Sequence, residues 1–122
     1  SAYEAKPSWQ TDFGCARRTV ADVSADANPS TGASVYDTTR YQGQSGWFQV
    51  GGTSLSAPLI GAVFALGTAG DTYGSYPYAH ASSLFDITSG SNGNCSPSYL
   101  CTAGSGYDGP TGLGTPNGTG GF

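Results

Sequence analysis

Apolar residues concentrate in one long run of the chain. Between Thr53 and Gly67 they fall on every side of a helical wheel, at Leu55, Leu59, Ile60, Val63, Phe64 and Leu66. A helix that is apolar all round is normally buried, so we expect a buried helix over residues 53–67. Pro58 is tolerated only in the first turn of such a helix, which places its start near Ser54, and Gly67 is typical of its end.

Shorter apolar stretches predict strands at 20–23, 33–36 and 47–50. The turn-forming residues 28–32 separate the first two, so we expect 33–36 to be the return strand that pairs with 20–23.

The remaining segments are polar or rich in glycine. The stretch 41–45 predicts a turn, a short helix is expected around 78–85, and residues 1–17 read as an irregular loop. From Thr88 onward the chain consists almost entirely of Gly, Ser, Asn, Pro and Thr. Such a tail has few side chains with which to form a core, so it needs another source of stability.

The composition narrows the function classes. A chain of 122 residues suffices for one small domain, and with 10% charged residues and 20 glycines it suits a loop-rich, secreted hydrolase. The four basic residues form no stripe, which argues against nucleic-acid binding. No apolar run approaches the roughly 20 residues that cross a membrane. The acidic pI near 4.4 fits work outside the cell at low pH.

The three cysteines are an odd count. Cys95 and Cys101 lie close together in a Pro-containing loop, and we expect a local disulfide between them in an oxidising compartment. Cys15 is left over. It is either a free thiol or the partner of a cysteine on another segment.

The segment Gly51-Gly52-Thr53-Ser54-Leu55-Ser56-Ala57-Pro58 is the strongest candidate for chemistry. A serine at a helix N-terminus lies among free backbone N–H groups and the positive end of the helix dipole, and both stabilise a developing oxyanion. The alternative is that Thr53 or Ser54 only caps a core helix. The segment resembles the nucleophile motif G-T-S-x-x-x-P of the subtilisin-like clan, which implies that Ser54 is the nucleophile. Subtilisins of that clan use a Ser-His-Asp triad, and sedolisins use Ser-Glu-Asp with a further Asp in the oxyanion hole.

The C-terminal tail favours the sedolisins. Residues 84–90 (LFDITSG) and 104–114 (GSGYDGPTGLG) resemble the calcium site of that family. The resemblance implies that Ca²⁺ is held by the carboxylates of Asp86 and Asp108 and by the main-chain oxygens of Ile87, Gly104 and Gly106. Calcium prefers six or more oxygen ligands of these two kinds, and a tail without a core needs such a staple. Taken singly, each Asp is equally consistent with an ordinary turn.

The resemblance extends over residues 17–118, since 21–32 (ADVSADANPSTG) and 111–118 (TGLGTPNG) also fit the family. It implies a mixed α/β fold, namely the C-terminal portion of a subtilisin-like fold with a buried nucleophile helix and a Gly-rich calcium-binding tail. Residues 1–122 would then form the C-terminal half of a secreted, acid-active peptidase domain. Its substrates would be proteins or peptides, cleaved by endopeptidase or tripeptidyl-peptidase action.

The catalytic acids of the family have no match in this sequence. Sedolisins carry Glu and Asp four residues apart, whereas the fourth residue after Glu4 is Ser8. Asp22 and Asp26 lack the sequence setting of the oxyanion Asp, and His80 follows Ser54, whereas the subtilisin histidine precedes the nucleophile. A serine without a base is a weak nucleophile. We therefore expect this chain to be inactive alone and to need an N-terminal part, either a separate processed chain or a missing segment.

Two other function classes stay open at this stage. One is a non-catalytic, calcium-stabilised module that keeps the fold without activity. The other is a carbohydrate-binding or cell-surface module, for which Tyr73, Tyr76 and Tyr78 would form the aromatic platform.

Overall fold

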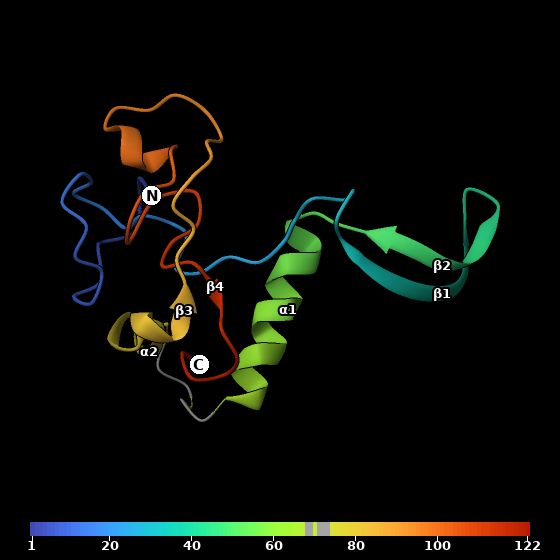
Figure 1. Ribbon diagram of the computed structural model, residues 1–122. Coiled ribbons are helices and arrows are strands. Elements are labelled where there is room, and N and C mark those ends of the chain that lie inside the picture. The colour runs from blue at the N-terminus through green and yellow to red at the C-terminus, as the bar shows by residue number, and fades with distance from the viewer. Residues whose placement is uncertain (68–69, 71–73) are drawn as a thin grey trace.

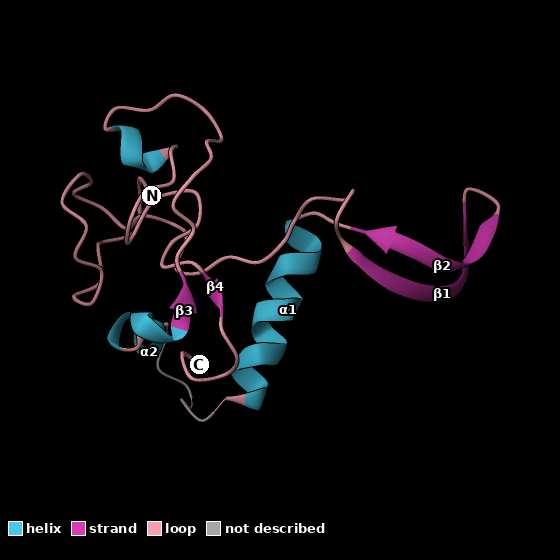
Figure 2. Cartoon of the chain, viewed as in Figure 1, coloured by secondary structure: helices cyan, strands magenta, loops and turns pink. Residues whose placement is uncertain are grey.

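The computed structural model describes residues 1–67, 70 and 74–122. Its elements in chain order are β1 (Ala33–Tyr41), β2 (Gln44–Val50), α1 (Thr53–Leu66), α2 (Ser75–Ala79), β3 (Leu84–Phe85) and β4 (Thr115–Pro116), with 3₁₀ turns at Ala81–Ser83 and Ser98–Leu100. Loops connect these elements and make up the whole N-terminal segment (Figure 2). The predicted tyrosine platform falls partly on Tyr73, which lies outside the described residues.

Strands β1 and β2 form an antiparallel hairpin that extends away from the rest of the chain (Figure 1). Gln42 and Gly43 both have positive φ, as a two-residue hairpin turn requires, which confirms the turn predicted over 41–45. The register pairs Tyr36 with Trp47. Their rings pack edge to face, with ring centroids 5.3 Å apart. The hairpin therefore presents two exposed aromatic side chains, Tyr36 and Trp47.

The expected pairing of 20–23 with 33–36 is wrong. Residues 33–36 pair with 47–50 instead, and residues 20–23 belong to no strand. The physical reason is that the longer alternating stretch after residue 43 supplies a closer partner across a two-residue turn. The predicted short helix around 78–85 is also displaced, because α2 begins at Ser75 and ends at Ala79.

Helix α1 forms where the apolar run predicts it, with Pro58 in its N-terminal half and Gly67 at its C-cap. The expectation that it is buried is not met in this chain, because none of its residues is buried. Leu66 is 75% exposed and Leu59 is 43% exposed. Among the described residues, few side chains cover the helix. One that does is the C-terminal Phe122, whose ring packs edge to face on Phe64 with ring centroids 4.9 Å apart.

The apolar core is small and lies near the C-terminus. Leu84 and Phe122 are the buried hydrophobic side chains of the described residues, together with Pro77 of α2. Leu84 belongs to β3, which pairs with β4 in a short antiparallel ribbon. The chain end thus closes over β3 and the last turn of α1 (Figure 1).

A buried polar cluster supplements this core. Gln10 is 3% exposed, and its amide nitrogen donates to the Thr19 carbonyl at 2.7 Å. Its amide oxygen accepts the Thr19 N–H at 2.8 Å. The same nitrogen contacts the hydroxyls of Tyr78 and Tyr107 at 3.1 and 3.2 Å. Burial raises the pKa of both tyrosines well above the usual value, so both hydroxyls stay protonated. Gln10 thereby joins the N-terminal loop to α2 and the tail.

Candidate nucleophile helix and glycine-rich tail

Ser54 lies exposed in the first turn of α1. The helix is capped by Gly52 at φ 92°, a left-handed backbone conformation that favours glycine. The Gly52 N–H donates to the Ala27 carbonyl at 2.6 Å, which fixes the entry of the chain into the helix. The predicted glycine-serine segment therefore places Ser54 where its hydroxyl faces solvent.

The backbone at this helix start has free donors. The N–H groups of Leu55 and Ser56 both donate to the Gly52 carbonyl, at 2.9 and 3.3 Å. Those of Thr53 and Ser54 have no hydrogen-bond partner among the described residues. An unpaired N–H beside a serine hydroxyl, at the positive end of a 14-residue helix, can stabilise an oxyanion.

Ser56 has a role that the sequence reasoning missed. Its hydroxyl donates to the Asp26 carbonyl at 2.9 Å and lies 3.2 Å from the Ala25 carbonyl oxygen. These contacts attach the first turn of α1 to the segment that precedes the hairpin. No pattern in the sequence indicates this contact, because its partners lie 30 and 31 positions away in the chain.

The titratable groups that were considered from the sequence as partners of Ser54 interact with other residues. His80 stacks on Tyr76 with ring centroids 3.8 Å apart, and its Nδ1 lies 3.0 Å from the Tyr76 carbonyl oxygen. Asp22 pairs with Arg18 and accepts the Tyr78 hydroxyl at 2.8 Å. Among the described residues, the Ser54 side chain has no hydrogen-bonded base.

Asp26 also has a local role. Its carboxylate accepts the Asn28 N–H at 2.8 Å and the Thr31 hydroxyl at 2.7 Å. These two hydrogen bonds, that from Thr31 first, hold the pKa of Asp26 below its usual value. Asp26 therefore stabilises the turn before the hairpin.

The structure brings the two predicted calcium carboxylates onto one glycine-rich loop. Asp108 is 1% exposed, and its Oδ2 accepts the Gly104 N–H at 2.9 Å. Its Oδ1 accepts the Thr111 N–H at 2.9 Å and the Thr111 hydroxyl at 2.8 Å. Asp86 is exposed, and its Oδ2 accepts the Gly106 N–H at 2.8 Å. Both carboxylates thus contact the glycines whose carbonyls were predicted as ligands.

The donor set of this loop suits a calcium ion. The carbonyl oxygens of Ile87, Gly104 and Gly106 accept no hydrogen bond from the described residues. Gly106 has φ 80°, a conformation that turns the loop between the two carboxylates. Among the described residues, no three side chains of His, Cys, Asp or Glu lie close enough together to hold a metal ion by themselves. Calcium binding here would therefore depend on main-chain oxygens and water as well as on the two carboxylates.

The Cys95–Cys101 disulfide is present, with Cα atoms 5.5 Å apart, and confirms the pairing predicted from spacing. Cys15 is a free cysteine of intermediate exposure. The disulfide closes the loop that carries the 3₁₀ turn at 98–100.

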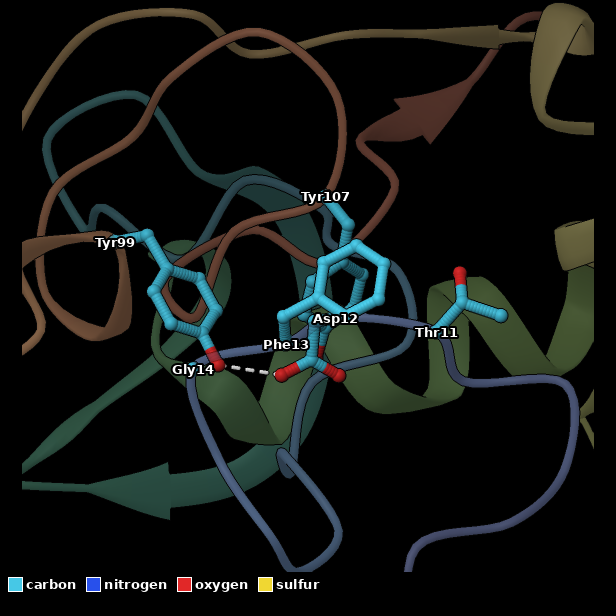
Figure 3. A pocket seen from close by; sticks show the side chains of 6 residues that line it. All are labelled: Thr11, Asp12, Phe13, Gly14, Tyr99 and Tyr107. Carbon is cyan, nitrogen blue, oxygen red and sulfur yellow. Dashed lines mark hydrogen bonds between the residues drawn. The ribbon is translucent and has the colours of Figure 1, made fainter.

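A hollow of about 360 Å³ between the N-terminal loop and the C-terminal tail is lined by none of the predicted site residues (Figure 3). Asp12 lies in it, 2.7 Å from the ammonium of Lys6 and 2.9 Å from the hydroxyl of Thr19. The Tyr99 hydroxyl donates to the same carboxylate (Figure 3). Burial opposes ionisation, yet these donors and the Lys6 charge hold the pKa of Asp12 below its usual value. No pattern in the sequence predicts this cluster.

No family model matches the chain. It is 36% identical to sedolisin of Pseudomonas sp. (strain 101) over 126 residues and 36% identical to xanthomonalisin of Xanthomonas sp. (strain T-22) over 125 residues. Both matches cover 94% of this chain.

The fold comparison agrees with the sequence comparison. The structure is similar to Pseudomonas sedolisin, a serine-carboxyl proteinase complexed with two molecules of pseudo-iodotyrostatin. The TM-score is 0.68 at 35% identity over 96% of this chain. By sequence and by fold, the chain is therefore similar to a segment of sedolisin-family peptidases, as the resemblance predicted.

The match is to a segment of these proteins. The chain covers 20% of the curated sedolisin, 14% of the curated xanthomonalisin and 33% of the solved sedolisin chain. Within the described residues no helix is both long enough and apolar enough to span a membrane.

Proposed function

We propose that this chain is the nucleophile-bearing part of a sedolisin-type serine peptidase and that Ser54 is the nucleophile. The proposal rests on the structure at the start of helix α1. Ser54 is exposed in the first turn of α1, its own N–H is unpaired among the described residues, and Gly52 before it has a left-handed backbone. The sedolisin relatives match this chain over nearly its whole length, which makes a capping role for this serine the weaker explanation.

The reaction would proceed through an acyl-enzyme. The Ser54 hydroxyl oxygen attacks the carbonyl carbon of a peptide bond while a base accepts its proton. The Ser54 N–H donates to the oxyanion that forms, and the helix dipole adds to its stabilisation. The amine leaves with a proton returned by the base, and water then hydrolyses the ester to regenerate the serine.

The base must come from outside residues 1–122, because the family's Glu and Asp have no match in this sequence. We infer that residues 1–122 act as the C-terminal half of a peptidase domain, completed by an N-terminal part that supplies both acids. A carboxylate base titrates well below a histidine, so the assembled enzyme would work at acidic pH on protein or peptide substrates. The acidic composition and the disulfide fit an extracellular enzyme.

Calcium would stabilise the tail. Its ligands would be the carboxylates of Asp86 and Asp108 and the carbonyl oxygens of Ile87, Gly104 and Gly106. The ion would balance two negative charges and cross-link β3 to the loop before β4, and it would take no part in the bond-breaking steps.

A labelling experiment tests the nucleophile. The chain is combined with the acid-bearing part of Pseudomonas sedolisin at acidic pH and treated with a serine-directed fluorophosphonate. We expect one adduct, on Ser54, and none in Ser54→Ala, while Ser45→Ala, which changes an exposed hairpin serine, labels like the wild type. An adduct that persists in Ser54→Ala would contradict the assignment. Absence of any adduct would favour the non-catalytic, calcium-stabilised module.

A further inference from the structure

The two halves of the proposed calcium site lie at the two ends of one loop. Asp86 and Ile87 directly follow β3, and the segment 104–108 contains the other proposed ligands. The Gly106 N–H donates to the Asp86 carboxylate at 2.8 Å, so the two ends of the loop meet. Residues 88–103, called here the connecting loop, run out from β3 and back (Figure 1). The spacing of the calcium ligands therefore depends on how the connecting loop is closed.

Backbone hydrogen bonds join the two sides of the connecting loop. The Ala103 N–H donates to the Gly90 carbonyl at 2.9 Å. Farther from the calcium site, the Asn92 N–H donates to the Cys101 carbonyl at 2.9 Å. Because Gly104, a proposed ligand, directly follows Ala103, this pairing begins at the calcium site and continues toward the tip of the loop.

The Cys95–Cys101 disulfide closes the far end of this pairing. The carbonyl of Cys101 accepts the Asn92 N–H, so the cross-link and the last hydrogen bond of the pairing share a residue. A disulfide limits the conformations that the chain around it adopts. Reduction therefore frees the tip and allows the pairing to open from that end. Cys95 is exposed, so a small thiol can reach the bond.

The turn that the disulfide closes also contacts the ligand segment directly. The N–H of Gly109, which follows Asp108 in the chain, donates to the Tyr99 carbonyl at 2.8 Å. A Cβ atom at Gly109 would lie 2.4 Å from the Leu100 carbonyl oxygen, so this close approach requires glycine. The disulfide thus restrains a turn that packs against the residue next to the buried Asp108.

We propose that the Cys95–Cys101 disulfide holds the calcium site in its binding conformation, so that reduction of the disulfide lowers the affinity for calcium. This inference rests on the calcium site of the proposed function and adds a redox dependence to it. A cross-linked loop has fewer conformations to lose when calcium orders it, so the oxidised chain binds the ion at a smaller entropic cost. By reciprocity, calcium favours the oxidised form by the same factor.

A dithiol such as dithiothreitol supplies the two electrons for the reduction. One thiolate of the reagent attacks a sulfur of the disulfide, which gives a mixed disulfide and releases the other cysteine as a thiol. The second thiol of the reagent then attacks the mixed disulfide. The reagent leaves as a cyclic disulfide, and Cys95 and Cys101 are both thiols.

Calcium titration by calorimetry tests the proposal on the oxidised chain and on the chain reduced with dithiothreitol. We expect the Kd for calcium to be at least about fivefold higher in the reduced chain. In a dithiothreitol redox buffer, saturating calcium should raise the equilibrium ratio of oxidised to reduced chain by the same factor, as measured by alkylation and mass spectrometry. Slow amide exchange at Leu113, whose N–H donates to the Asp22 carbonyl at 2.9 Å, shows that the reduced chain stays folded outside the loop.

A matched pair of variants tests the connecting loop with the disulfide intact. The Ser91 hydroxyl lies 2.9 Å from the Cys101 carbonyl oxygen and 2.8 Å from that of Gly93, whereas the exposed Ser98 side chain has no hydrogen bond among the described residues. We expect Ser91→Ala to raise the Kd for calcium about threefold, as loss of one hydrogen bond implies. Ser98→Ala should bind calcium like the wild type. This pair decides the question if the reduced chain unfolds.

The outcomes separate this inference from the proposed function. Equal calcium affinity in the oxidised and the folded reduced chain overturns the inference and leaves the calcium site in place. If reduction unfolds the chain, equal affinity in Ser91→Ala and Ser98→Ala overturns it in the same way. Absence of calcium binding by the oxidised chain overturns both the inference and the calcium site. None of these results alters the labelling of Ser54, which tests the nucleophile separately.

Discussion

The hydroxyl of Ser56 donates to the carbonyl of Asp26 at 2.9 Å, across 30 positions of sequence. This contact joins the first turn of α1 to the turn that Asp26 stabilises through Asn28 and Thr31. The hairpin, β1 and β2, lies between the two partners in the chain. The position of the exposed Ser54 thus depends on a neighbour that is itself not a candidate for catalysis.

Replacing Ser56 with Ala should destabilise the chain. The change removes one donor shared among the carbonyl oxygens of Ala25, Asp26 and Gly52, and the expected loss is about 1 kcal/mol in the free energy of unfolding. Urea denaturation measures it as a lower midpoint with an unchanged slope. In the assembled enzyme, Ser56→Ala should lower kcat more than it raises KM, because the helix start shifts while the substrate-binding residues stay.

Ser54→Ala is the matched control for that measurement. Its hydroxyl is exposed and has no hydrogen bond among the described residues, so its urea midpoint should equal that of the wild type. Equal destabilisation by the two substitutions would show that the Ser56 contact does not stabilise the helix start.

Calcium should raise the melting temperature, and Asp86 and Asp108 should respond differently to substitution. At calcium concentrations about 100 times the Kd, binding adds about 2.7 kcal/mol of stability. Asp86→Asn should abolish this gain with little effect in EGTA, because Asp86 is exposed. Asp108→Asn should also cost about 1–3 kcal/mol in EGTA, because its buried carboxylate accepts three hydrogen bonds.

The control for the calcium experiment is Asp37→Asn, which changes a carboxylate on the hairpin that accepts the Thr39 N–H at 2.8 Å. It should leave the response to calcium intact. A wild-type melting temperature that is the same in calcium and in EGTA would refute the calcium site.

The sequence predicted the features that depend on local pattern. The helix from Thr53, the turn at 41–45 and the Cys95–Cys101 disulfide follow from periodicity, turn chemistry and spacing. Prediction from the sequence failed where the structure depends on which segments of the chain lie close together in space. Residues 20–23 were assigned the wrong partner, and α1 was expected to be buried although the described chain cannot cover it.

The contacts that hold the site were not predictable for a related reason. Ser56 and Gln10 act through partners many residues away, and no periodicity encodes which carbonyl or hydroxyl will lie beside them. The interactions of Asp12 could not be predicted either, because an irregular loop brings Lys6, Thr19 and Tyr99 to its carboxylate. Family resemblance supplied the predicted ligands, and the structure adds that two of them contact the glycines of the same loop.

Stability should fall at acidic pH because of Asp12. Its folded pKa is lowered below that of an unfolded aspartate, which is about 3.9. The stabilisation is therefore complete above the unfolded pKa and is lost as the pH falls through the folded pKa. Unfolding free energies measured from pH 6 to pH 2 should decrease below about pH 4, and Asp12→Asn should flatten this dependence.

Tyr99→Phe and Lys6→Gln refine the pH experiment. Burial, followed by the hydrogen bond to Asp12, raises the pKa of Tyr99 to about 12, so the hydroxyl remains a donor throughout the range. Either substitution removes a group that lowers the pKa of Asp12, so the folded pKa moves toward the unfolded one and less stability should be lost between pH 6 and pH 2. A pH dependence identical to that of the wild type in both variants would exclude Asp12 as its cause.

Gln10→Leu should be among the more damaging single substitutions. The side chain is similar in size, but the buried N–H and C=O of Thr19 lose their partner, and the hydroxyls of Tyr78 and Tyr107 lose a shared donor. Leaving buried polar groups unsatisfied costs about 1–3 kcal/mol. Gln49→Leu is the control, since Gln49 makes one exposed hydrogen bond, to the Ser30 carbonyl, and should cost about 0.5 kcal/mol or less.

Gln10→Leu should also weaken calcium binding, because Tyr107 directly precedes Asp108. The Tyr107 hydroxyl donates to the Ala21 carbonyl at 2.7 Å and is held from the other side by Gln10. Loss of Gln10 loosens Tyr107 and with it the backbone that positions the Asp108 carboxylate. Calcium titration by calorimetry should show a higher Kd for Gln10→Leu than for Gln49→Leu. Equal Kd values, together with a clear loss of stability in Gln10→Leu alone, would confine Gln10 to holding the N-terminal loop.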